Sequence, residues 1–149
     1  MTASTSTEIP PNTSTASRHL RWGWWSLLVW LSVGIVLEAL HGFKIGWYLD
    51  VGQEMRRLMF TLGHAHGTLL ALVNLAAAAS LRIWSLDAAQ IPGANAMRTA
   101  SLLLPVGFIL GGITVHDGDP GLGVLLVPIG GVLLVYAVAR FATHITKNT

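Results

Sequence analysis

The sequence predicts an all-α integral membrane protein, a four-helix bundle with both termini in the cytoplasm. Four stretches are apolar over lengths that cross a bilayer, only 11% of the 149 residues are charged, and the mean hydropathy is +0.59. A soluble domain carries about 25% charged residues, so this chain has less than half of that share. Its expected surrounding is therefore the lipid bilayer, and its expected location is the cell inner (plasma) membrane as a multi-pass protein.

The first 17 residues differ in composition from the rest. They are almost all Thr, Ser, Ala, Pro and Asn, with Glu8 as the one charged residue. Such a segment buries too little apolar surface to offset the entropy of ordering, so residues 1–17 are expected to form a disordered tail. Residues 18–149 are then the transmembrane domain, with helices at about 22–40, 57–84, 96–115 and 122–142.

The helix starts and ends are marked by interface-seeking and turn-forming residues. Clustered tryptophans at the first helix suit a membrane interface, and Asp50 resembles a cap for the second helix. Asn95 is a plausible cap for the third helix. The polar sequence at 116–121 predicts a tight turn before the fourth helix. Pro105 and Pro128 lie inside the last two expected helices and predict kinks there.

The orientation follows from the basic residues. One side carries six of them: Arg18, Arg21, Arg82, Arg98, Arg140 and Lys147. The opposite side carries three, which are Lys44, Arg56 and Arg57. Because cytoplasmic loops are enriched in Lys and Arg, this count places both termini in the cytoplasm. The nine basic residues are scattered at helix ends, so the net charge of +2 does not indicate a nucleic-acid partner.

Histidines and carboxylates gather near the expected outer interface. Glu38 and His41 end the first helix, His64 and His66 lie two turns into the second, and His116 ends the third. Intramembrane imidazoles are costly and usually functional. The candidate cofactor ligands are therefore His66, His64 and His41. The candidate metal ligands are His64, His66, Glu38 and His116, since the chain has no cysteine to supply a thiolate.

Helical geometry separates the two central histidines. At 100° per residue, His64 and His66 lie on either side of a stripe of small residues that includes Gly63 and Gly67. They cannot chelate one ion from a regular helix. One is expected to face the first helix, near Glu38 or His41, and the other to face the third or fourth helix.

Each of these features also has a purely structural interpretation. The glycine pairs Gly63/Gly67 and Gly107/Gly111 suit helix packing, and Asn74 suits an interhelical hydrogen bond. Glu38 can reach the interface with its carboxylate. The turn that contains His116 can be a solvated loop. His19 and His144 lie in polar flanks and indicate no site.

A local resemblance covers residues 57–70, with the sequence RLMFTLGHAHGTLL. It resembles helix 2 of haem-copper oxidase subunit I, where an H-G pair holds a low-spin haem. By that resemblance His66, followed by Gly67, is the ligand position, and His41, His64 or His116 would supply a second ligand. The chain departs from that family in having four expected helices instead of twelve and no H-P-E copper-ligand helix, so oxidase activity is not implied.

The same stretch is similar to small four-helix bacterial membrane proteins with H-x-H opening the second helix, and more faintly to hydroxylaminobenzene mutase. Three functions remain open. The first is a small membrane protein that binds haem or a transition metal near the outer face. The second is an accessory or assembly subunit of a larger complex or a homo-oligomer, docked through the glycine seams. The third is a membrane-embedded isomerase or mutase, with Glu38 or a histidine as acid–base group.

Overall fold

The computed structural model describes residues 11–50, 52, 54–84, 91 and 93–148. They form four long helices joined by short segments. The elements are α1 (Pro11–Gly42), α2 (Gly46–Leu49), α3 (Glu54–Ile83), α4 (Ala94–Ile113), the 3₁₀ helix η3 (Leu122–Leu125) and α5 (Leu126–Asn148). The expected all-α class with four long helices is confirmed.

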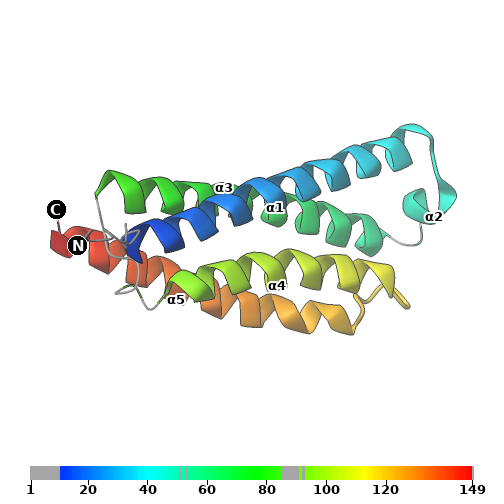
Figure 1. Cartoon of the computed structure of the whole chain (residues 1–149). Helices are drawn as coiled ribbons and strands as arrows, with labels where there is room; N and C mark the ends of the chain where they lie inside the picture. Colours follow the sequence, from blue (N-terminus) through cyan, green and yellow to red (C-terminus); the bar gives the residue numbers. More distant parts are fainter. Residues whose placement is uncertain (1–10, 51, 53, 85–90, 92, 149) are drawn as a thin grey trace, which may run out of the picture.

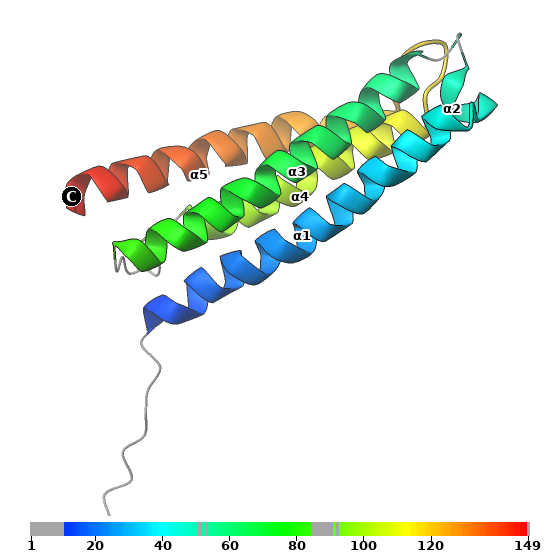
Figure 2. The same ribbon diagram turned by 90° about the horizontal axis from the view of Figure 1, so that it is seen from above.

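The four long helices form two layers. Figure 1 shows α1 and α3 in one layer and α4 and α5 in the other, and Figure 2 shows α1 and α5 on opposite flanks. Helix α1 packs on α3, α3 on α4, and α4 on α5. The start of α1 and the end of α5 lie at one end, called here the terminal end. Helix α2 and the turn at 114–121 lie at the other, called the α2 end.

All four long helices are long and apolar enough to cross a membrane. The candidate spans are Thr15–Gly42, Glu54–Ile83, Ala94–Ile113 and Leu122–Lys147. The two central helices are the most buried ones within the bundle. The flanking helices expose large apolar side chains, such as Trp25 and Ile35 of α1 and Val132 and Val135 of α5. Four apolar helices that expose such side chains indicate a membrane protein.

Two groups of buried side chains hold the layers together. One lies at the terminal end and joins all four helices. It consists of Ala16, Ala77, Leu81, Ile91, Ala94, Met97, Ala137 and Phe141. The other lies between α3 and α4 and contains Met59, Leu70, Leu104 and Phe108, with residues of η3 and α5 packed against it. Four of the eight residues in the first group are alanines, a residue type that lets membrane helices approach closely.

Helix α1 begins earlier than the sequence predicts. It starts at Pro11 and therefore includes seven residues of the expected tail 1–17, while residues 1–10 lie outside the described part. Proline is favoured in the first helical turn because its missing N–H group has no helical partner there. Ala16 is fully buried against the terminal-end group. This packing, which composition does not reveal, favours helix in residues 11–17.

The fourth long helix also starts differently from the expectation. Residues Leu122–Leu125 form the 3₁₀ helix η3, and α5 runs from Leu126 to Asn148. Pro128 consequently lies in the first turn of α5, where proline displaces no helical hydrogen bond. The expectation that Pro128 lies in the interior of a helix is therefore wrong, whereas Pro105 does lie inside α4, where a kink stays a prediction.

The connection after α4 contains the predicted tight turn. His116 and Asp119 exchange two backbone hydrogen bonds, of 3.1 and 2.9 Å. Between them, Asp117 and Gly118 have φ angles of 50° and 85°. Two successive residues with positive φ define a type I′ hairpin turn, for which Asp-Gly is a favoured pair. The ability of Asp117 and Gly118 to adopt positive φ angles thus allows the tight turn through which the chain returns to α5.

Arg56 ties the α2 end together. Its side chain is buried, and its guanidinium donates to the carbonyl oxygens of Gly112 (3.3 Å) and Trp47 (2.8 Å). It also lies 4.6 Å from the centre of the Trp47 ring. Gly112 belongs to the last turn of α4, where unpaired carbonyl groups attract a cation. One arginine of α3 therefore caps α4 and fixes α2.

Candidate functional site

The imidazole of His64 faces α1. Its Nδ1 lies 2.8 Å from the carbonyl oxygen of Trp30. A carbonyl oxygen only accepts, so Nδ1 carries the hydrogen and Nε2 of the neutral ring keeps a free lone pair. The ring also lies against Gly34, where an added Cβ would come within 2.5 Å of Cε1. Because Gly34 has no side chain, the imidazole of His64 can pack directly against α1.

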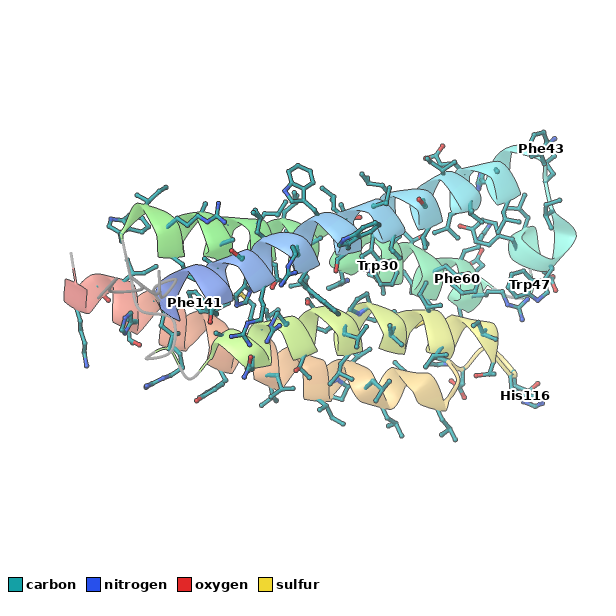
Figure 3. All side chains as sticks on the ribbon, in the orientation of Figure 1. Trp30, Phe43, Trp47, Phe60, His116 and Phe141 are labelled. Atoms are coloured by element: carbon teal, nitrogen blue, oxygen red, sulfur yellow. The ribbon has the colours of Figure 1, made fainter. Side chains whose placement is uncertain are left out.

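Gly67 lies one helical turn after His64 in α3 and contacts the side chain of Trp30. A Cβ at Gly67 would lie 2.1 Å from the Trp30 ring, so the indole rests directly on the α3 backbone. Figure 3 shows Trp30 near the middle of the bundle, on the side of α1 that faces α4. His64 and Gly67 thus anchor the backbone and the ring of Trp30, respectively.

His66 faces away from this contact. Its Nδ1 donates to the carbonyl oxygen of Leu62 (2.8 Å), one turn back in the same helix. Its ring centre lies 4.9 Å from that of Phe108 in α4. The expectation that the two histidines face different neighbours is confirmed, with His64 toward α1 and His66 toward α4. The two imidazoles do not meet at one ligand.

A hollow lies beside His64, between α1, α2 and α3, toward the α2 end. Its volume is about 850 Å³. Five residues that line it bear polar side chains: Glu38, His41, Tyr48, Thr61 and His64. Its remaining walls are the apolar or small residues Leu31, Gly34, Ile35, Leu37 and Gly42. Three of the sequence-predicted site residues therefore border one space.

The polar groups of the hollow are held to different degrees. Tyr48 is 5% exposed, and its ring stacks on Phe60 with centres 6.3 Å apart. His64 is fixed by its bond to Trp30. Glu38 and His41 are exposed at the end of α1, and no ion pair joins them in the described part of the chain. The hollow therefore has one rigid wall and one adaptable wall.

His116 does not belong to this group. Its side chain is 88% exposed, and its Nδ1 lies 3.0 Å from the carboxylate of Asp117 in the same turn. Figure 3 shows it at the end of the α4–α5 connection, distant from Trp30. The structural interpretation of this turn as a solvated loop therefore describes it well.

The proposed metal ligands do not form a cluster. Among the residues that the structure describes, no three His, Asp or Glu side chains lie close enough to hold a metal ion. His64, Glu38 and His41 share the hollow, while His66 and His116 lie elsewhere. A protein site for a bare transition-metal ion needs three or four ligands, so the arrangement does not support one.

Sequence reasoning missed a buried histidine at the terminal end. His19 is fully buried, and its Nδ1 donates to Oδ1 of Asn74 (2.8 Å), whose amide group donates to the Leu70 carbonyl. Its Nε2 has no hydrogen-bond partner in the described residues, and the ring meets Phe141 edge-on. The expected interhelical hydrogen bond of Asn74 is thereby confirmed, and His19 is its unforeseen partner.

A second polar contact lies close to His19. The indole N–H of Trp22, one turn along α1, donates to the hydroxyl of Ser101 in α4 (2.9 Å). That hydroxyl in turn donates to the Arg98 carbonyl (2.8 Å). Since His19 and Trp22 are three residues apart, they share one face of α1. The spacing of His19 from Trp22 could have indicated that His19 faces the bundle. The polar residues that precede His19 suggested a solvated segment instead.

Comparison of this chain with models of known families, with curated proteins and with solved structures gives no match.

Proposed function

We propose that the protein is a multi-pass protein of the inner membrane with both termini in the cytoplasm. Four helices of sufficient length support it. At the α2 end the accessible basic residues are Lys44 and Arg57, because the guanidinium of Arg56 binds carbonyl groups inside the bundle. The six basic residues at the terminal end against three at the α2 end favour a cytoplasmic terminal end.

We further propose that the hollow between α1 and α3 binds a small amphipathic molecule from the membrane. The observation that carries this proposal is the orientation of His64, whose Nδ1 is occupied by Trp30 and whose Nε2 lone pair remains available. Binding pockets are typically concave and mostly apolar, with a few polar groups that fix the ligand. The hollow combines apolar walls with His64, Glu38 and Thr61.

Such a site supports acid–base chemistry on its ligand. A group that accepts a proton and a group that returns it must border the same space. His64 and Glu38 fulfil this condition from two different helices. An isomerase or mutase of a small apolar substrate is therefore the catalytic form of the proposal, with His64 as the positioned base.

Haem binding is a second candidate, favoured by one specific observation. Histidines that ligate iron usually donate their other ring nitrogen to a carbonyl or carboxylate, and His64 donates Nδ1–H to a carbonyl. His64 would hold the iron, and His41 borders the same hollow. Bound haem would supply redox chemistry. The residue that the oxidase resemblance names, His66, lies on the other side of α3, so the ligand position would shift to His64.

The accessory-subunit hypothesis rested on the glycine seams. In the structure these glycines face helices of the same chain. Gly63 lies against Ile109 of α4, and Gly107 lies against Val127 of α5. They therefore serve internal packing, and docking to a partner would need a different surface.

Two tryptophan variants test the binding proposal. Ile35→Trp fills the hollow, whereas Val132→Trp adds the same side chain to α5; both positions are 71% exposed. Native mass spectrometry of protein purified in mild detergent should detect a bound small molecule in the wild type and in Val132→Trp, but not in Ile35→Trp. Equal occupancy in all three proteins would contradict the proposal.

An absorption spectrum of the same samples tests the haem candidate. A Soret band that disappears in His64→Ala and persists in His66→Ala would establish haem at the hollow. A colourless wild-type protein would exclude it and leave the binding of a colourless amphipathic molecule as the function.

A further inference from the structure

We infer that the hollow beside His64 selects amphipathic molecules with a positively charged head, such as a protonated or quaternary amine. This inference rests on the proposed binding function and names the class of ligand. It follows from the charge of the residues around the hollow, from the neighbours of Glu38 and from the orientation of the hydrogen-bonding groups.

The first step concerns charge. Glu38 is the one carboxylate among the residues that line the hollow, and none of those residues is Lys or Arg. Glu38 also has no ion pair within the described residues. A carboxylate beside apolar walls and lipid is poorly screened. The hollow therefore presents an uncompensated negative charge.

The second step concerns the basic residues of the same end. Arg57 lies 3.7 Å from Glu54, on the first turns of α3. Arg56 is buried and binds the carbonyl groups of Gly112 and Trp47. Both guanidinium groups of α3 thus have other partners. Lys44, the third basic residue of this end, does not line the hollow and forms no ion pair with Glu38 in the described part of the chain. A cation for Glu38 is then best supplied by a ligand.

The third step concerns the direction of hydrogen bonds. The lone pair of His64 Nε2 and both oxygens of Glu38 accept hydrogen bonds. A protonated amine donates to such groups, and a quaternary amine satisfies the charge alone. Leu31, Ile35 and Leu37 form the apolar wall next to these acceptors. They provide a surface for the hydrocarbon part of the molecule.

A matched pair of probes separates charge from shape. Benzyltrimethylammonium carries the charge, and neopentylbenzene is its neutral analogue, with carbon in place of nitrogen. Both are titrated into the full-length protein in lipid nanodiscs, and binding is followed through the ring signals of ¹³C-labelled histidine. His64→Ala assigns the signal of the hollow. The His66 signal reports that each variant is folded, because His66 lies on the other side of α3.

The control for Glu38→Gln is Glu54→Gln. Glu54 is an exposed carboxylate at the same end of the bundle, but it does not line the hollow. We expect the cation to bind the wild type about tenfold more tightly than the neutral probe, a preference that Glu38→Gln removes and Glu54→Gln retains. This result would support the inference.

The other outcomes overturn it, and they also distinguish the inference from the proposed function. If both probes bind equally, and Ile35→Trp abolishes binding while Glu38→Gln changes neither affinity, the hollow binds ligands but does not select cations. A cation preference that survives Glu38→Gln overturns the inference as well. If neither probe shifts the His64 signal saturably, the inference and the proposed binding function both fail.

Discussion

At the scale of single residues, the contact between Trp30 and α3 explains much of the Gly-His-Ala-His-Gly sequence. His64 binds the Trp30 carbonyl, and Gly67 leaves room for the ring. The histidine therefore has a structural partner at Nδ1 and an available lone pair at Nε2. A functional role for His64 depends on Nε2 alone, and substitutions must separate these two contributions.

Gly67→Ala should destabilise the protein. The added Cβ would lie 2.1 Å from the Trp30 ring, so α1 must shift away from α3. Overpacking of this kind costs about 1–3 kcal/mol, against a gain of at most about 1 kcal/mol in helix propensity from Gly to Ala. Reversible unfolding in mixed micelles measures the difference.

Gly131→Ala is the matched control for this substitution. Gly131 lies in α5, and a Cβ there would meet nothing within 4 Å. It should be neutral or slightly stabilising because the propensity gain has no opposing contact. If both variants lost the same stability, the close approach of Trp30 to Gly67 would be wrong.

His19 and Asn74 should be energetically coupled. Each single alanine variant leaves a buried polar group of the other residue without its partner, a loss of about 1–3 kcal/mol. The double variant removes both groups, so its loss should be smaller than the sum of the two single losses by about 1 kcal/mol. Unfolding of the four proteins under identical conditions gives this coupling. Additive losses would show that the hydrogen bond does not join α1 to α3.

The same pair shows which residue-level features could be predicted from sequence. Asn74 was expected to bond across helices, because it interrupts an apolar stripe of small residues. Its partner was not expected, because His19 follows a polar segment that resembles a solvated tail. The packing of Ala16 in a four-helix contact extends α1 backward and buries His19. Such long-range packing leaves no periodic signal in a short polar segment.

At the scale of elements, Arg56 should matter more than its neighbour Arg57. Arg56→Lys keeps the charge, but a single ammonium group cannot reproduce two carbonyl contacts and the stacking on Trp47. We expect a loss of about 1–2 kcal/mol. Arg57→Lys should change stability by less than about 0.5 kcal/mol, since its pair with Glu54 is long and solvated. The unfolding free energies of the two variants decide between these expectations, and equal losses would contradict the capping role.

Apolar length predicted the four long helices well, but their boundaries less well. The expected helix at 57–84 corresponds to Glu54–Ile83, and that at 96–115 to Ala94–Ile113. The largest differences are at α1 and α5, the flanking helices, where burial at the terminal end extends both. Hydropathy predicts which residues lie in the apolar part of the bilayer. The ends of α1 and α5 are stabilised by contacts with other helices, which a single sequence does not reveal.

At the scale of the whole molecule, the candidate site depends on which helices are neighbours. Residue spacing predicted that His64 and His66 diverge, and the structure agrees. The gathering of His64, Glu38 and His41 around one hollow also required α1 to pack on α3. Helices adjacent in sequence usually pack together, so this part was accessible to prediction. Thr61 lies three residues before His64 in α3, so helical spacing already places it on the same face. Tyr48 was not foreseen, because its position depends on how α2 folds back.

The orientation of the molecule in the membrane can be measured directly because the chain contains no cysteine. Phe43 is 80% exposed at the α2 end, and Lys147 is exposed at the terminal end. With six basic residues at the terminal end, a membrane-impermeant maleimide should label Phe43→Cys in intact cells. It should label Lys147→Cys only after the inner membrane is opened. The wild type should stay unlabelled, and the reverse pattern would place Glu38 and the hollow on the cytoplasmic side, where they would meet a different set of ligands.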